Sequence, residues 1–288
     1  MRSLVLGLIA VAGCASAGSY GGTGSAAARA PLTSGDAVVR AMHDAHSRTW
    51  YRTLTFVQRT SFPDRPAQTW YEAAAFPGKL RIDIAPIDSA NATMYVGDSI
   101  HVFRGGRRVA ARADRNLLLT LGFDVYGQAP ETTIAQLREQ GVDLTKVHAT
   151  TWQGRPATVV GAAEGDSTSN QFWVDTERML FVRLIESVPG QGGGRSRLDI
   201  EFNRYQRLGR GWIAPEVIIR RDGTEIMREE YSDMRADVAL DPMLFGTTEY
   251  RKPGWVPCSW GDSRSPLRWP CSPAAPPTGR SRCRRSPA

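Results

Sequence analysis

Residues 79–84 are Lys79-Leu80-Arg81-Ile82-Asp83-Ile84, in which charged and aliphatic side chains alternate without exception. Successive side chains of a β-strand point to opposite faces of the sheet, so this stretch predicts a strand with one wet face and one apolar face. Pro77-Gly78 before it is typical of a tight turn. The same strict alternation returns at residues 198–203. Both halves of the chain are therefore predicted to contain half-buried strands.

Shorter alternating segments, separated by turn residues, fill most of the remaining chain. Further strands are predicted at residues 54–56, 68–76, 92–96, 99–103, 107–112, 145–152, 155–162, 169–175, 178–186, 196–206, 212–220 and 224–233. The period changes twice, which predicts one helix at about 35–47 and two short helices between about 114 and 140. We expect a mainly β fold (α+β through these minor helices). It would be an incomplete antiparallel β-barrel of about eleven strands with an N-terminal helix and a helical lid insertion.

The N-terminus carries an export pattern. Arg2 precedes a short apolar run, and the run ends in Val11-Ala12-Gly13-Cys14, which resembles the lipobox of bacterial lipoproteins. This resemblance implies a signal peptide at 1–13 and a lipid attached to Cys14, with residues 14–33 as anchor and flexible tether. Ala15, rather than Asp, follows the cysteine, which points to the outer membrane. Cleavage by an ordinary signal peptidase before Gly18 is the alternative, and either route places the domain outside the cytoplasm.

The charge of the chain is concentrated at its C-terminal end. The net charge is +7, but residues 251–288 hold eight Lys/Arg and one acid, so residues 1–250 hold 28 basic and 28 acidic residues. A domain without net charge offers no excess of basic residues for nucleic acid, so no nucleic-acid partner is predicted. Residues 247–288 are rich in Pro, Arg, Ser, Trp and Cys. A disordered tail and an out-of-frame translation both explain that composition.

Four short motifs resemble the outer-membrane lipoprotein-sorting (LolA/LolB-like) superfamily. They are the aromatic strand at 50–56, residues 76–81, Gly97-Asp98-Ser99, and the strand at 172–175. The resemblance covers about residues 34–246 and implies a half-barrel domain whose helices cap an apolar cavity for acyl chains. The arginine on which the periplasmic carrier of that superfamily depends matches no particular arginine here. A lipid anchor also suits a membrane-bound acceptor or a sensor better than a shuttling carrier.

The apolar faces of the predicted strands are the candidate site. They could simply fill a core, or they could enclose a cavity because few helices are available to cover so wide a sheet. The predicted cavity-lining residues are Leu54, Phe56, Trp70, Phe76, Leu80, Ile82, Ile84, Met94, Val96, Phe172, Val174, Leu180, Val182, Leu198, Ile200 and Phe202. The predicted lid residues are Leu117, Leu118, Leu121 and Phe123.

Motifs for catalysis, metals and cofactors are not found. His43 and His46 lie on one predicted helix without a third ligand, so we expect them on its surface and predict no metal and no cofactor. Glu229 and Glu230 are adjacent in a strand, which sends their carboxylates to opposite faces and excludes them as an acid/base pair. No serine lies in a nucleophile-elbow context. The chain is therefore not expected to be an enzyme.

The sequence favours non-catalytic binding of acyl chains or lipoproteins in the bacterial envelope. It predicts a lipid-binding lipoprotein that acts in lipoprotein sorting and transport at an outer membrane, faces the periplasm and is a monomer. The alternative is an envelope stress sensor or interaction lipoprotein that has the same fold and no lipid cargo. A lipid-modifying enzyme is a third hypothesis.

Overall fold

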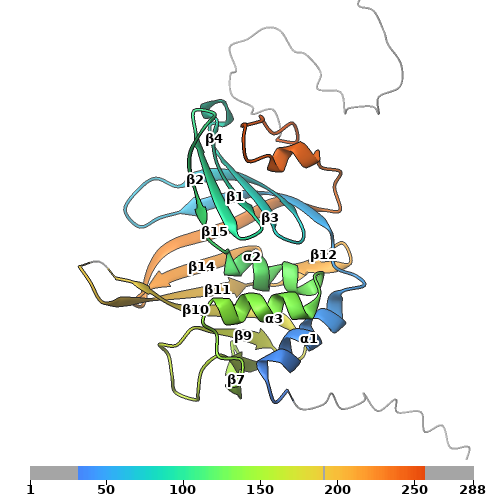
Figure 1. Ribbon diagram of the computed structural model, residues 1–288, viewed down its shortest axis with the longest axis vertical. Helices are drawn as coiled ribbons and strands as arrows, with labels where there is room; N and C mark the ends of the chain where they lie inside the picture. The colour runs from blue at the N-terminus through green and yellow to red at the C-terminus, as the bar shows by residue number, and fades with distance from the viewer. Residues whose placement is uncertain (1–31, 191, 257–288) are drawn as a thin grey trace, which may run out of the picture. The chain divides into compact units, whose positions relative to one another are not determined.

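An antiparallel sheet forms the framework of the domain (Figure 1). The computed structural model describes residues 32–190 and 192–256, and within them this sheet has thirteen strands in the order β6-β5-β4-β3-β2-β1-β15-β14-β11-β10-β9-β8-β7. Its strands are β1 (Thr53–Ser61), β2 (Gln68–Ala75), β3 (Lys79–Ile84), β4 (Asn91–Val96), β5 (Ser99–Arg104), β6 (Arg107–Ala113), β7 (Val147–Trp152), β8 (Arg155–Val160), β9 (Gln171–Asp175), β10 (Leu180–Pro189), β11 (Arg195–Asn203), β14 (Glu216–Arg221) and β15 (Thr224–Ala236).

The topology is a chain of hairpins joined in the middle by the pairing of β1 with β15. The two outermost strands, β6 and β7, do not pair with each other, so the sheet stays open. Strand directions turn steadily from β4 to β10, as Figure 1 shows. The prediction of a mainly β, incomplete antiparallel barrel with few helices is confirmed.

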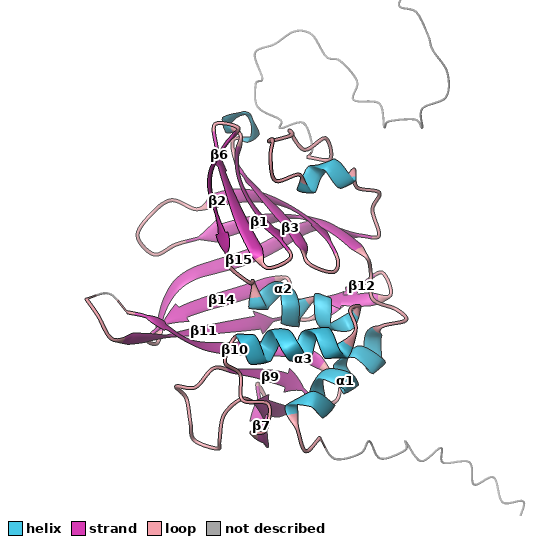
Figure 2. Ribbon diagram, viewed as in Figure 1, coloured by secondary structure: helices cyan, strands magenta, loops and turns pink. Residues whose placement is uncertain are grey.

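Three helices lie together in Figure 2, against the strands of the second half of the chain. They are α1 (Gly35–His46), α2 (Leu117–Gly122) and α3 (Pro130–Glu139), with the 3-10 turn η2 (Asp124–Tyr126) between the last two. The side chain of Ser34 caps α1 by accepting from the backbone N–H of Ala37 at 3.2 Å. The helices expected at about 35–47 and within 114–140 are thus confirmed.

The strand expected at 212–220 is divided in two. Pro215 interrupts it, since proline has no N–H to give to a ladder. Residues before the break form β13 (Gly211–Ile213), which pairs with β12 (Gln206–Leu208) in a small separate ribbon. The remaining short elements are the 3-10 turns η1 (Ile87–Ser89) and η3 (Pro242–Phe245).

The charged face of β3 is buried, contrary to the expectation that it is wet. Arg81 is 0% exposed and Asp83 is 1% exposed. The Arg81 guanidinium donates to both carboxylate oxygens of Asp83, at 2.6 and 2.8 Å, and to the carbonyls of Leu244 (2.8 Å) and Arg251 (2.5 Å). The hydroxyl of Tyr250 donates to Asp83 at 3.1 Å. A segment far away in the sequence covers this face, and strand alternation alone cannot reveal such a cover.

This C-terminal segment extends the domain beyond the boundary predicted at residue 246. Trp255 packs against the cluster of Ala73, Leu244 and Phe245, on the outer side of the sheet. Lys252 pairs with Asp88 at 2.5 Å. The tail predicted from residue 247 onward therefore begins too early, because residues 247–256 pack on the sheet. Its remainder, residues 257–288, lies outside the described residues.

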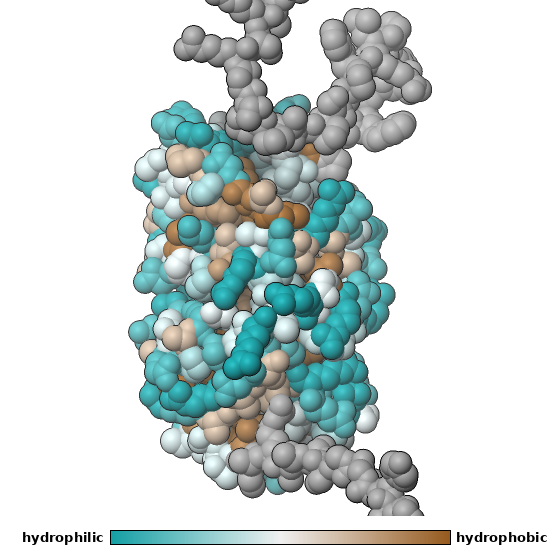
Figure 3. All heavy atoms as spheres, turned by 90° about the vertical axis from the view of Figure 1, so that its right-hand side faces the viewer, coloured by the Kyte–Doolittle hydropathy of each residue, from teal (hydrophilic) through white to brown (hydrophobic). Residues whose placement is uncertain are grey.

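The predicted export features, Cys14 included, also lie outside the described residues. Within residues 32–190 and 192–256, no helix has the length and apolar character needed to cross a membrane. Figure 3 shows the side of the domain that carries α1 and the C-terminal segment. This side is mostly hydrophilic, with small apolar groups between the polar residues.

Candidate ligand-binding cavity

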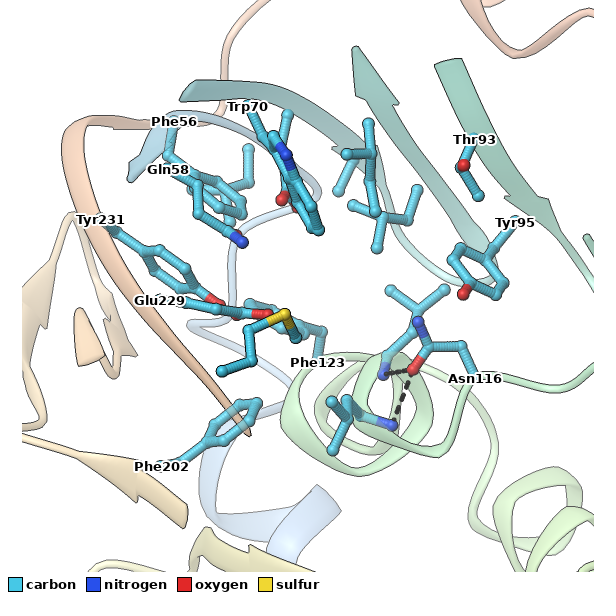
Figure 4. A pocket seen from close by; sticks show the side chains of 18 of the residues that line it. Phe56, Gln58, Trp70, Thr93, Tyr95, Asn116, Phe123, Phe202, Glu229 and Tyr231 are labelled. Atoms are coloured by element: carbon cyan, nitrogen blue, oxygen red, sulfur yellow. Dashed lines mark hydrogen bonds between the residues drawn. The ribbon is translucent and has the colours of Figure 1, made fainter. Parts of the chain in front are cut away.

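A cavity of about 290 Å³ lies between the inner face of the first half of the sheet and α2. Alternate residues of β1, β2, β3, β4 and β15 face it, as the two-residue period of a strand requires. Figure 4 shows Trp70 and Phe123 on opposite sides of this space. The lining residues are Leu54, Phe56, Gln58, Trp70, Glu72, Ala74, Phe76, Leu80, Ile82, Ile84, Thr93, Tyr95, Asn116, Leu118, Leu119, Phe123, Phe202, Ile219, Met227, Glu229 and Tyr231.

Half of the predicted lining residues meet in this cavity. Seven of them come from the first half of the sheet and the turn after β2, and one comes from β11. These eight residues are Leu54, Phe56, Trp70, Phe76, Leu80, Ile82, Ile84 and Phe202. The structure therefore brings these eight side chains together on one wall of the cavity.

Met94 and Val96 were placed on the wrong face of β4. The pairing of β3 with β4 sets Arg81 opposite Met94 and Ile82 opposite Thr93. Thr93 and Tyr95 therefore face the cavity, whereas Met94 packs with Ala92 and Phe103 in a separate buried cluster. Both alternating sets of β4 contain a large residue, so only the register with β3 decides which set faces inward.

The lining residues predicted from the second half, apart from Phe202, do not reach this cavity. Phe172, Val174 and Leu180 are 0% exposed and belong to a filled core. Val182 lines a different recess beside Arg155 and Asp175. Leu198 and Ile200 line neither the cavity nor this second recess.

The helical elements explain why this half has a filled core. Tyr126 of η2 accepts the backbone N–H of Phe181 in β10 at 2.9 Å, and α2 contacts β10. The apolar face of the second half is thus packed against the helical layer.

The predicted lid helix is α2, which contributes the side chains of Leu118 and Leu119 to the cavity wall, and Phe123, the residue after the helix, contributes a third. Leu118 and Phe123 were predicted lid residues, and Leu119 was missed. Leu117 and Leu121, the other two predicted lid residues, are buried and do not line the cavity. The Phe123 ring stacks on that of Phe76 with centroids 5.1 Å apart.

Two features fix the position of α2. The carboxamide oxygen of Asn116 caps it by accepting from the backbone N–H groups of Leu118 (2.9 Å) and Leu119 (3.1 Å). Gly122, its last residue, allows close approach to the sheet. A Cβ atom at this position would lie 2.8 Å from the ring of Phe202.

A polar cluster interrupts the apolar wall. Glu72 of β2 is 4% exposed and Glu229 of β15 is 9% exposed, and both line the cavity. The hydroxyl of Tyr231 donates to Glu229 at 2.7 Å. Gln58 lies beside them, and its amide donates to Thr60 at 2.9 Å. Figure 4 shows Gln58, Glu229 and Tyr231 gathered on one side of the pocket.

Burial changes the acidity of this cluster. It raises the pKa of Glu229 from 4.5 to about 7, although the hydrogen bond from Tyr231 acts in the opposite direction. Burial, and then the nearby Glu229, raise the pKa of Glu72 well above its usual value. The same two causes raise the pKa of the Tyr231 hydroxyl. An apolar wall thus encloses two carboxyl groups that hold their protons more tightly than carboxyls in water.

The sequence contains a signal for this cluster that the apolar residues alone do not give. Glu72 is in phase with Trp70 and Phe76, two residues predicted to face inward. A glutamate in phase with an apolar face must be buried with it. The separation of Glu229 from Glu230 was predicted correctly: Glu230 pairs outside with Arg59 at 3.2 Å. Glu229 instead lies near enough to Glu72, more than a hundred residues away in the sequence, to raise the pKa of that carboxyl.

His46 is not on the helix surface, as had been expected. It is 8% exposed, and the centroid of its ring lies 5.4 Å from that of Trp50 and 5.1 Å from that of Tyr126. Its Nε2 lies 2.8 Å from the carbonyl oxygen of Arg178. Among the described residues, no group of three or more His, Cys, Asp or Glu side chains could hold a metal ion.

Comparisons with known proteins found similar solved structures, among them one from Desulfovibrio piger and one from Nitrosomonas europaea. A DUF1329 family protein from Desulfovibrio piger is 12% identical, with a TM-score of 0.46, and the match covers 73% of this chain and 95% of that one. A LolA superfamily protein from Nitrosomonas europaea is 14% identical, with a TM-score of 0.41, and the match covers 74% and 97%. No protein family model matches the chain, and no curated protein does.

Proposed function

We propose that this chain binds an acyl chain, free or as part of a lipid or lipoprotein, without chemically changing it. The observation that carries the proposal is the cavity beneath α2, whose lining is mostly aliphatic and aromatic. A water-exposed apolar wall of this kind gains free energy by taking up an apolar ligand, at about 0.8 kcal/mol for each methylene removed from water. In the second half, the helices already cover the apolar strand faces, so burying a ligand there would yield no such free energy.

The size of the cavity limits what it holds. Ligand sites are commonly about 300–1,000 Å³, and this cavity of about 290 Å³ is at the lower end. One apolar chain, or part of one, is a suitable occupant. Since α2 contributes Leu118 and Leu119 to one wall and is followed there by Phe123, an outward movement of this helix would admit a longer ligand.

The proposed place of action is the bacterial envelope, with the domain tethered by a lipid on Cys14 to the outer membrane and facing the periplasm. The support is the apolar run that ends in Val11-Ala12-Gly13-Cys14. Two or three acyl chains anchor a protein stably, whereas one does so only marginally. Cys14→Ser should abolish labelling by palmitate. An unlabelled wild-type protein that begins at Gly18 would contradict the anchor.

The binding proposal is tested with a fluorescent fatty-acid analogue titrated into the purified domain. Ile82→Asp places a charge in the cavity wall and should reduce binding at least about tenfold, because the carboxylate must stay solvated. Val109→Asp is the matched control, since Val109 is 60% exposed on β6 and lies outside the cavity. Circular dichroism must show the strands retained in both variants.

Equal binding by folded Ile82→Asp and wild-type protein would refute the cavity as the ligand site. Native mass spectrometry of protein purified from membranes is the complementary measurement. Co-purifying lipid supports the proposal. A consistently empty cavity favours the sensor or interaction protein with the same fold.

A further inference from the structure

We infer that the ligand of this cavity carries a protonated amine beside its apolar chain, and that Glu72 and Glu229 together bind the amine. This inference rests on the proposed function and specifies its ligand class. The two carboxyls line the same cavity from β2 and β15. No Lys, Arg or His side chain is among its lining residues.

Glu72 differs from the other buried carboxyls of the described residues. Asp83, Asp175 and Asp199 each accept charge-assisted hydrogen bonds from an arginine. Asp124 accepts the backbone N–H of Gly78 at 3.0 Å. Glu229 accepts a hydrogen bond from the hydroxyl of Tyr231.

No residue in 32–190 or 192–256 donates a hydrogen bond to the Glu72 side chain, which is 4% exposed in an apolar wall. A buried carboxyl without a partner costs free energy, whereas the same group beside a cation is stabilised. A donor from the ligand would remove that cost.

A cation fits this position better than any other head group. One ammonium has three donors, so it can donate to Glu72 and still have donors left for other acceptors of the cavity wall. Aromatic rings also stand near the carboxyls: the ring of Phe56 lies 4.4 Å from that of Tyr231, and Trp70 faces the same space. Aromatic faces attract cations in desolvated sites. A carboxylate or phosphate head group would instead meet two acidic side chains and no basic one.

The charge of the site depends on pH in a defined way. The titratable groups that face the cavity are Glu72 from β2, Tyr95 from β4, and Glu229 and Tyr231 from β15; α2 contributes none. The pKa of Glu229 is about 7, so raising the pH through neutrality adds a negative charge to the cavity. Binding of an amine should strengthen over that interval, while binding of a neutral alcohol of equal chain length should not.

The test measures displacement of the fluorescent probe by n-dodecylamine, 1-dodecanol and dodecanoate at about pH 8, above the pKa of about 7 of Glu229 and where alkylamines remain protonated. Wild-type protein should bind the amine at least about tenfold more tightly than the alcohol. The double variant Glu72→Gln/Glu229→Gln should lose this preference and still bind the alcohol, which also shows that its cavity has folded. Glu230→Gln, on the outer face of β15, is the matched control and should keep the preference.

Equal affinity of wild-type protein for amine and alcohol would overturn the inference and leave the proposed function intact. So would an amine preference that survives in the double variant. If neither the probe nor any dodecyl compound binds, the proposed function itself fails. These results are distinguishable because the alcohol reports on the cavity and the amine reports on the carboxyls.

Discussion

The two halves of the sheet show the same strand alternation and bury it in different ways. In the second half, helical elements pack on the inner face, and residues such as Phe172 and Leu184 are 0% exposed. In the first half, α2 lies over the inner face and leaves a cavity, while the C-terminal segment covers the outer face of β3. Coverage by other segments, rather than the strand pattern, decides whether an apolar face becomes a core or a binding site.

The largest loss of stability is expected from removing the contacts between the C-terminal segment and the outer face of β3. Arg81→Ala removes the partner of the buried Asp83 and should lower the free energy of unfolding by about 3–5 kcal/mol. Urea denaturation measures this loss. Arg112→Ala is the control, because its pair with Asp114 is exposed and should contribute less than about 1 kcal/mol. Similar stability of both variants would show that the C-terminal segment does not hold β3.

A second pair of substitutions compares the inner faces directly. Leu184→Ala in the filled half should cost about 2–5 kcal/mol, because the packed surroundings cannot collapse into the hole. Leu80→Ala in the cavity wall should cost about 1 kcal/mol or less, because the side chain already borders empty space. Both free energies of unfolding come from denaturant titrations of the ligand-free protein. Equal losses would mean that the cavity is as tightly packed as the core.

The third effect is a change in the pH dependence of stability. The pKa of Glu229 rises on folding from 4.5 to about 7, so the folded chain binds this proton more tightly than the unfolded chain. The protein should then lose stability as pH rises from about 4.5 to about 7, by on the order of 3 kcal/mol. Glu229→Gln should remove this loss and be the more stable protein above neutrality.

Thermal unfolding of wild-type and Glu229→Gln protein at several pH values measures this effect. Glu230→Gln controls for the change in net charge, since its carboxylate is outside and 44% exposed. Parallel curves for wild-type and Glu229→Gln protein would show that Glu229 ionises freely. In that case the contrast between the two faces of β15 would disappear.

The comparison also shows what the sequence could predict. Alternation at 79–84 and 198–203 predicted the strands because it reflects backbone geometry within one segment. It could not predict the face of β4, where Thr93 and Tyr95 compete with Met94 and Val96, since pairing with β3 decides it. The burial of Arg81 depends on Leu244 and Arg251, and the site of Glu229 depends on Glu72. Each is a contact between distant segments, which local periodicity does not contain.

The smallest effect is expected where the two halves meet, at Gly122 of α2. A Cβ there would approach the Phe202 ring to 2.8 Å, and Phe202 borders the cavity, so Gly122→Ala must displace the ring or the helix. We expect a net loss of about 1 kcal/mol, because overpacking exceeds the gain in helix propensity from glycine to alanine. Denaturant titration measures the loss, and the fluorescent probe should bind more weakly to a cavity that the ring has entered. Gly254→Ala is the control, since nothing lies within 4 Å of its Cβ position. Unchanged stability and binding in Gly122→Ala would show that α2 moves away from the sheet at little cost, and the helix would then be a mobile cover for the cavity instead of a fixed wall.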